Sequence, residues 1–220
     1  MTFQRARSEE QREIRRRAIL DTALAMLDEM SVAEVTLNEL SRRVGLAKSN
    51  VLRYFESREA VLLELLERGL REWLAEVSVE LDAGIDPGLP ARERGDRLAA
   101  ILGRSLGRHT VLCDLVNAQV GVLEHNVSVD VVVAYKRSAL ESLMAMVDVV
   151  RRHVPELGDG AWTVCVLTVI MAGALWPYSQ PSASSRAAHE ADPALAALVV
   201  GWPTTLETAV ATLITGTLAR

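Results

Sequence analysis

The stretch TLNELSRRVGLAKSNVLRYF, residues 36–55, decides the fold prediction for the first part of this 220-residue chain. Two short helices that cross at about 90 to 120° need a small residue where they approach, a glycine at the turn and apolar side chains between them. Ser41 is the small residue and Gly45 lies at the turn. The expected interior consists of Leu40, Val44, Leu46 and Val51. The stretch therefore satisfies the packing requirements of a helix-turn-helix.

The second helix of this motif leaves polar side chains on its outer face, namely Lys48, Ser49, Asn50, Arg53 and Tyr54. Lysine and arginine suit phosphate or guanine, asparagine suits adenine or phosphate, and tyrosine suits phosphate. The same spacing also fits an ordinary helical hairpin with a solvated polar face, because short matches to a helix-turn-helix arise by chance. The sequence on either side of the motif is needed to separate these two interpretations.

Apolar residues recur at spacings of three and four along the chain, and the two-residue alternation typical of strands is essentially absent. This pattern predicts an all-α chain. Capping boxes are expected where helices begin near Ser8, Thr36 and Thr204. The segment 177–193, rich in Pro, Ser and Ala, is expected to be a loop. Helices are expected over about 8–29, 36–45, 48–55, from 57 to a break at 84–90, 91–106, 110–123, 128–153, 160–176 and 204–218.

Composition and charge exclude several classes of protein. Half of the residues are apolar, which is enough for a sizeable core and excludes a disordered chain. The net charge of −5 excludes a polycation that coats nucleic acid over its whole surface. The basic residues of the first part cluster over 12–17 and 42–58. Any contact with nucleic acid is therefore expected to be local and to involve this part.

The sequence predicts a cytoplasmic protein that does not span a membrane. Residues 1–17 are charged and lack the apolar core of a signal peptide. The two cysteines, Cys113 and Cys165, show no disulfide spacing. The apolar run 161–176 holds 16 residues, whereas a membrane span needs about 20. This run is expected to be a helix that is buried against protein on nearly every side.

The run from Arg16 to about Leu66 resembles the N-terminal DNA-binding domain of TetR-family transcriptional regulators. The resemblance includes the first-helix pattern ILDTALAML, the capped TLNEL, the turn VGLAKSNV and the junction YFESREAVL into a long fourth helix. It implies an all-α fold with an N-terminal three-helix helix-turn-helix domain, residues 1–56. A long helix would join this domain to a helical ligand-binding and dimerisation domain, residues 57–220.

The resemblance also implies a function. The chain is expected to be a ligand-responsive transcriptional regulator, most typically a repressor that binds a palindromic operator as a homodimer and is released by a small molecule. Its expected partners are double-stranded DNA, a small-molecule effector and a second copy of itself, without a membrane. Arg53 is expected to contact a base. The expected DNA contacts are Thr36, Arg43, Lys48, Ser49, Asn50, Arg53, Tyr54 and Arg58.

Two residues depart from the family pattern. Ala47 stands where the family usually has a Ser or Thr that caps the recognition helix, and a missing cap costs about 1 kcal/mol. Leu52 replaces a common Tyr that contacts the DNA backbone. These departures favour an alternative function, an all-helical dimer that binds small molecules or proteins and does not bind DNA.

Residues 57–220 are expected to hold a ligand pocket and a dimer interface. Two polar residues, His109 and Asn117, lie on otherwise apolar helix faces and need a partner, although an apolar residue at helical spacing is more often ordinary core. The pocket candidates are Trp73, His109, Cys113, Val116, Asn117, Val120, Met144 and Trp162, with Tyr135 as a further one. Homodimer interfaces are more apolar than ordinary surface, so the nearly uncharged helices 160–176 and 204–218 suggest an interface of Val166, Ile170, Leu206, Val210, Leu213 and Ile214.

Motifs for enzymes are weak in this sequence. Residues 103–107, GRSLG, match the G-x-S-x-G nucleophile elbow, but that motif needs a turn between a strand and a helix, and this match lies in a helical pattern. His109 and Cys113 are spaced for one metal ion, but two ligands alone form a weak site. We expect neither enzymatic activity nor a bound metal or cofactor.

Overall fold

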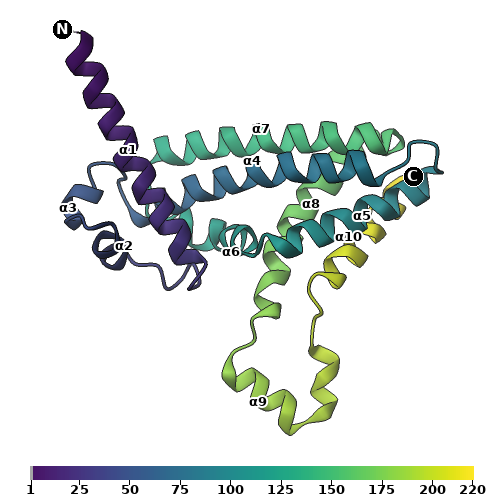
Figure 1. Ribbon diagram of the computed structural model, residues 1–220. Coiled ribbons are helices and arrows are strands. Elements are labelled where there is room, and N and C mark those ends of the chain that lie inside the picture. The colour runs from purple at the N-terminus through teal and green to yellow at the C-terminus, as the bar shows by residue number, and fades with distance from the viewer. Residues whose placement is uncertain (1) are drawn as a thin grey trace. The chain divides into compact units, whose positions relative to one another are not determined.

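The computed structural model describes the backbone of residues 2–220, and the side chains of all these residues except 2–8, 196 and 197. The described residues form helices and no strand, which confirms the predicted all-α fold. Shorter helical turns lie at Gln119–Leu123, Pro155–Leu157, Trp176–Ser179 and Pro193–Leu198. The α-helices (Figure 1) are α1 (Thr2–Leu27), α2 (Leu37–Val44), α3 (Lys48–Val51), α4 (Arg58–Gly84), α5 (Ala91–Arg108), α6 (Thr110–Ala118), α7 (Val129–His153), α8 (Gly160–Leu175), α9 (Ala183–Ala191) and α10 (Thr204–Leu218).

The chain forms two compact units. The first unit contains the residues up to Arg68 together with Ala118–Lys136. The second unit contains Gly69–Asn117 and Arg137–Arg220. The long helices α4 and α7 therefore contribute residues to both units.

Apolar side chains of α1 and α4 supply much of the core of the first unit. Ion pairs between Arg16 and Glu64 and between Asp21 and Arg68 join the two helices outside this core. Burial of a Leu or Ile side chain stabilises a fold by about 1.5 to 3 kcal/mol. The buried set includes Ile19, Leu20, Ala23 and Leu27 of the predicted α1 seam, and Val61, Leu62, Leu65 and Leu66 of α4.

In the second unit, α5 and α10 approach closely because glycines of α5 face α10. A Cβ atom at Gly103 would lie 3.2 Å from the Cα atom of Glu207 and 3.3 Å from its backbone nitrogen. A Cβ atom at Gly95 would meet the side chain of Ile214 at 2.6 Å. The backbone contact at Gly103 leaves no room for a side chain, whereas a side chain at Gly95 would require Ile214 to shift.

The GRSLG match is explained by this helix packing. Ser105 is fully buried within α5, and its Oγ accepts a hydrogen bond from Trp73 Nε1 at 3.0 Å. The flanking Gly103 and Gly107 face Glu207 and Pro203 across the contact. The motif therefore lies inside a regular helix, without the strained turn that would expose a nucleophilic serine.

Within the single chain helix α8 is buried along one face, so the expected burial on nearly every side stays a prediction that needs a partner subunit on the other face. By length and composition, Gly160–Ser179 is apolar enough to cross a membrane, because the chain continues helically beyond Pro177 through Trp176–Ser179. Core helices of globular domains share these properties. A Cβ atom at Gly173 would lie 2.9 Å from the backbone nitrogen of Asn117, so α8 crosses the end of α6 closely. The buried residues of α8 are Ala161, Val164, Cys165, Thr168, Ala172 and Gly173.

Helices α1 and α3 differ in length from the predictions. Helix α1 begins at Thr2 instead of Ser8, because the Gln, Arg and Ala residues before Ser8 favour helix. Helix α3 ends at Val51 instead of Phe55. The N–H groups of Arg53 and Tyr54 donate to carbonyls three residues back, which turns the chain before Phe55 is reached.

Two predictions for the C-terminal part were also wrong. The expected loop contains α9, whose first turn is capped by Ser182 Oγ, the acceptor for Ser185 N–H at 3.1 Å. Thr204 does not cap α10, because the N-cap position is Pro203 and Thr204 is already helical. The Thr205 N–H reaches back to the Gly201 carbonyl at 2.9 Å, so the chain coils before the expected cap.

The contact between α5 and α10 predicts a large effect of Gly103→Val. The added side chain would meet the backbone of α10, and such overpacking costs about 1 to 3 kcal/mol. The control is Gly216→Val, because a Cβ atom there meets nothing within 4 Å. Thermal unfolding should give a lower midpoint for Gly103→Val only, and equal midpoints would contradict the close packing.

Candidate nucleic-acid interface

The backbone of α2 and the turn after it has the geometry of a helix-turn-helix. Thr36 Oγ1 accepts a hydrogen bond from Glu39 N–H at 3.2 Å and caps the start of α2. Gly45 has a φ of 72°, and its N–H donates to the Arg42 carbonyl. The Leu46 N–H donates to the Ser41 carbonyl at 3.0 Å. This left-handed C-cap ends α2 and sends the chain into α3.

The predicted interior of the motif is buried as expected. Leu40 and Val51 are fully buried, and Val44 and Leu46 are half-buried. Ser41, the small residue, is buried, and its hydroxyl donates to the Asn38 carbonyl at 2.8 Å. The helix-turn-helix prediction is therefore confirmed.

Helix α3 and the turn after it present the exposed polar face. Lys48, Ser49, Asn50 and Arg53 are exposed, and within the described part of the chain their side chains form no hydrogen bond or ion pair. Tyr54 is half-buried beside them. The hydrogen-bond donors and acceptors of these side chains are therefore available to a binding partner.

The two departures from the family pattern have visible consequences. No side-chain hydrogen bond caps α3 at Ala47. The Ala47 carbonyl accepts hydrogen bonds from the N–H groups of Asn50 and Val51 at 2.8 and 3.2 Å. Leu52 is 41% exposed beside the polar face, so its side chain is available for apolar contact with a partner.

Two of the arginines expected to contact DNA are already bonded within the fold. Arg43 forms ion pairs with Glu39 at 2.9 Å and Glu29 at 2.7 Å. Arg58 donates to the Val35 carbonyl at 2.8 Å and to Glu59 at 3.2 Å. Their contacts with DNA stay predictions.

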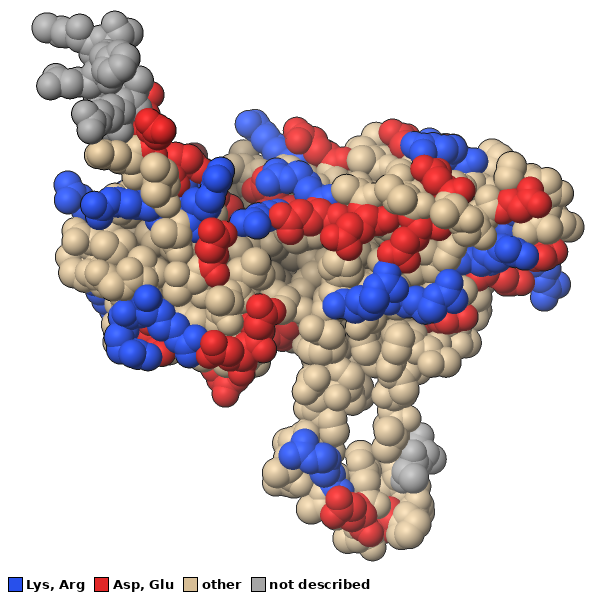
Figure 2. All heavy atoms as spheres, viewed as in Figure 1, with Lys and Arg blue, Asp and Glu red and all other residues tan. Residues whose placement is uncertain are grey.

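Glu39 holds the basic end of α2 together. Hydrogen bonds from Arg42 and Arg43 lower the pKa of Glu39 to about 2. The carboxylate is therefore charged at neutral pH and neutralises part of this local positive charge. Figure 2 shows the same pattern, with Lys and Arg side chains over α2 and Asp and Glu beside them.

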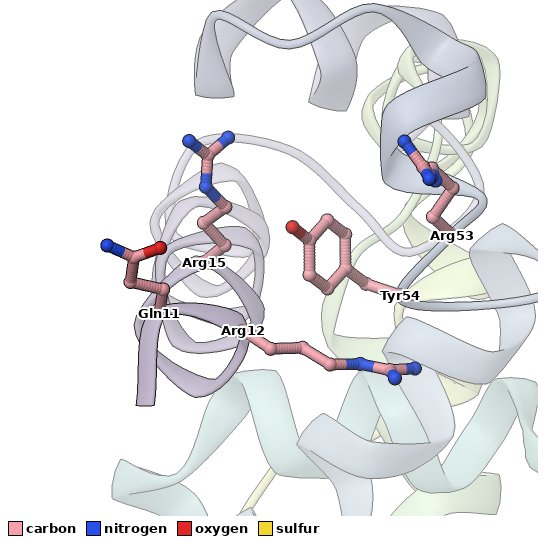
Figure 3. A pocket seen from close by; sticks show the side chains of 5 residues that line it. All are labelled: Gln11, Arg12, Arg15, Arg53 and Tyr54. Atoms are coloured by element: carbon pink, nitrogen blue, oxygen red, sulfur yellow. The ribbon is translucent and has the colours of Figure 1, made fainter. Parts of the chain in front are cut away.

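A basic cavity lies between α1 and the residues that follow α3. It has a volume of about 340 Å³ and is lined by Gln11, Arg12, Arg15, Arg53 and Tyr54. In Figure 3 the Tyr54 ring lies between Arg53 and the helix that carries Arg12 and Arg15, and its hydroxyl points toward that helix. The sequence showed Arg12 and Arg15 only as part of a basic cluster. Their spacing of three was the available signal for a shared helix face.

The pocket candidates of the second unit lie in different surroundings. Trp73 is buried and bonded to Ser105, and burial raises the pKa of the Cys113 thiol to about 12. His109 Nε2 lies 3.1 Å from Glu76, and Val116 is half-buried. The candidates Asn117, Met144 and Trp162 are exposed.

Two further candidates lie in the first unit. Val120 is exposed, whereas Tyr135 is buried and lines a cavity with residues such as Phe55 and Leu63. The ligand pocket stays a prediction. Among the described side chains, no group of three or more His, Cys, Asp and Glu residues could hold a metal ion.

The interface candidates separate into buried and exposed side chains. Leu206, Val210 and Ile214 are buried inside one chain, with Ile214 facing Gly95 of α5. Because α5 covers the face of α10 that carries these three side chains, they offer no apolar surface to a second chain. Ile170 is 55% exposed on α8, and Val166 and Leu213 are half-buried.

Comparisons with known families and structures agree with this fold. Residues 19–65 match the family described as "Bacterial regulatory proteins, tetR family". Residues 67–220 match "Tetracyclin repressor-like, C-terminal domain". No curated protein matches the sequence.

Solved structures share the fold at low sequence identity. The fatty acid degradation regulator FadR from Bacillus halodurans has a TM-score of 0.53 and 11% identity, covering 90% of this chain and 97% of that chain. A TetR transcriptional regulator from Rhodococcus sp. RHA1 has a TM-score of 0.52 and 16% identity, covering 96% and 97%. A putative transcriptional regulator from Pseudomonas aeruginosa PAO1 has a TM-score of 0.51 and 14% identity, covering 94% and 91%.

The family matches extend over most of the chain, and the helix-turn-helix geometry lies inside the N-terminal one. The chain therefore belongs to the TetR family of bacterial transcriptional regulators, and its helix-turn-helix is the DNA-binding domain of that family.

Proposed function

We propose that this protein is a cytoplasmic, ligand-responsive repressor without enzymatic activity. It binds a palindromic operator in double-stranded DNA as a homodimer, and a small molecule releases it. Residues 1–56 act as the DNA-binding domain, and residues 57–220 bind the ligand and the second copy.

This proposal rests mainly on the exposed polar face at α3, which the hydrogen-bonded turn at Gly45 positions after α2. Lys48, Asn50 and Arg53 are exposed there without a partner in the described part of the chain. Arg53 is the best candidate for a base contact, because a guanidinium can bond the O6 and N7 atoms of guanine together. Such a contact discriminates against a wrong base by about 1 to 3 kcal/mol.

Dimerisation is supported by the outer face of α8. This helix contains no charged residue, and Trp162 and Ile170 leave apolar surface exposed on it. The core of a homodimer interface is more apolar than ordinary protein surface. We place the second copy against this face, with Val166 and Leu213 at its edges.

Release by a ligand requires that the effector prefer one spacing of the two DNA-binding domains. Helix α4 is continuous from Arg58 to Gly84 and carries residues of both compact units. A ligand that binds only one spacing shifts the population toward it. A coupling of about 1 to 3 kcal/mol changes the affinity for the operator by about 5 to 150 fold.

A second candidate is a helical dimer that binds small molecules or proteins but not DNA. The exposed Leu52 and the uncapped start of α3 at Ala47 favour it. Both features reduce what α3 can contribute to DNA binding, so DNA binding is the property that separates the two candidates.

The base contact predicts a selective loss in Arg53→Ala. Duplexes enriched from a random library should bind the unaltered protein in a mobility-shift titration, and Arg53→Ala should lose about 5 to 150 fold in affinity for them. The control is Arg104→Ala, which removes an exposed arginine from α5 in the second unit. No shift with any duplex at low salt would favour the second candidate.

The same selection tests the homodimer. Two copies related by a twofold axis read an inverted repeat, with half-site centres about 34 to 36 Å apart or a multiple of that distance. Sequencing of the enriched duplexes should therefore show an inverted repeat, and direct repeats or a lone half-site would contradict the proposal.

The missing cap of α3 predicts that Ala47→Ser stabilises the protein. A serine hydroxyl at this N-cap position would accept a hydrogen bond from an N–H of the first turn, which is worth about 0.5 to 2 kcal/mol. Urea denaturation should show a higher midpoint for Ala47→Ser than for Ala47→Val, which adds bulk without an acceptor. Equal midpoints would contradict the assignment of a missing cap.

A further inference from the structure

We propose that Arg12 and Arg15 of α1, together with Tyr54, form a clamp for a backbone phosphate of DNA, beside Arg53, which reads a base. The clamp extends the DNA-binding surface from the helix-turn-helix onto the first helix. It rests on the proposed function, because the phosphate belongs to the duplex that α3 reads.

The chemistry of the basic cavity fits an anion with several acceptor oxygens. All of its lining side chains, those of Gln11, Arg12, Arg15, Arg53 and Tyr54, can donate hydrogen bonds, and no described carboxylate lines it. A volume of about 340 Å³ holds roughly ten water molecules at about 30 Å³ each. A phosphate group and some of its hydration water therefore fit inside.

The arginines of the clamp differ from the other arginines of the first unit. Arg16 pairs with Glu64, stacks over the Phe55 ring at 4.3 Å and donates to the Tyr54 carbonyl at 3.1 Å. Arg43 and Arg58 are likewise bonded inside the fold. In the described part of the chain, the side chains of Arg12, Arg15 and Arg53 have no such partner.

Electrostatics then favours an anion in the cavity that these side chains line. Like charges that face one cavity repel each other, and a bound anion replaces that repulsion with attraction. A guanidinium donates two parallel hydrogen bonds to phosphate oxygens, which gives the contact both strength and direction. The cavity is thus built to hold phosphate and not a carboxylate of its own chain.

The position of the cavity favours a phosphate of DNA over a free phosphate ion. Arg53 and Tyr54 follow α3 directly in the chain, so a duplex read by α3 would pass beside them. Figure 3 shows both residues next to the helix that carries Arg12 and Arg15. Helix α1 extends from Thr2 to Leu27 and therefore presents Arg12 and Arg15 on one continuous helix. Both arginines precede residues 19–65, so the proposed contact lies outside the segment that matches the family of bacterial regulatory proteins.

A phosphate clamp has a distinctive signature in binding experiments. Phosphate contacts carry no sequence information, so their loss weakens binding to all duplexes alike. The logarithm of affinity falls linearly with the logarithm of salt concentration, and each lost phosphate contact makes this fall less steep by about 0.9. A lost base contact, by contrast, reduces discrimination between sequences.

The test compares Arg12→Gln and Arg15→Gln with the unaltered protein on an enriched duplex and on its scrambled version. Each variant should bind both duplexes about tenfold more weakly, which corresponds to about 1.4 kcal/mol, and should lose about 0.9 from the salt slope. The matched control is Arg17→Gln, an exposed arginine of the same helix that does not line the cavity. It should change neither affinity nor slope to this extent.

The outcomes separate this clamp from the proposed function. Sequence-selective binding in which Arg12→Gln and Arg15→Gln behave like Arg17→Gln would overturn the clamp and leave the DNA-binding function intact. No binding of the unaltered protein to any duplex would overturn both. A melting temperature that inorganic phosphate raises in the unaltered protein but not in Arg12→Gln, with DNA affinity unchanged, would assign the cavity to free phosphate instead.

Discussion

The backbone turn at Gly45 fixes the position of α3, and the recognition surface depends on it. With a φ of 72°, Gly45 adopts a left-handed conformation, which costs residues with a side chain about 1 to 2 kcal/mol. Hydrogen bonds from the N–H groups of Gly45 and Leu46 close the end of α2. Leu40 and Val51 are then buried on either side of the turn. The polar residues of α3 face outward because this apolar contact faces inward.

Arginines of the first unit serve two purposes that a count of charges does not separate. Arg16, Arg43 and Arg58 hold the fold together through carboxylates, carbonyls and an aromatic ring. Arg12 and Arg53 line a cavity to which no described carboxylate contributes. A count of charges therefore does not show which arginines stay available, because carboxylates such as Glu39 and Glu64 engage the first set.

Local signals predicted the helix-turn-helix well. Thr36 and Gly45 act through hydrogen bonds and backbone angles that extend over a few residues, so the sequence shows where α2 begins and ends. The sequence was less informative where the partner of a side chain is remote in the chain. The apolar stripe of α10 with Leu206, Val210 and Ile214 indicates that the stripe is covered, but not whether α5 or a second chain covers it. Likewise, the sequence did not show which arginines Glu39 and Glu64 would engage.

Helix α3 contains only four residues. Isolated helices shorter than about 12 to 15 residues are marginal in water, so this one owes its order to Val51, which is fully buried beneath it. Loss-of-function selections for DNA binding would then recover apolar positions inside the domain as readily as polar ones on its surface. A substitution at Val51 that abolishes repression would act by disordering α3, although it removes no group that touches a base.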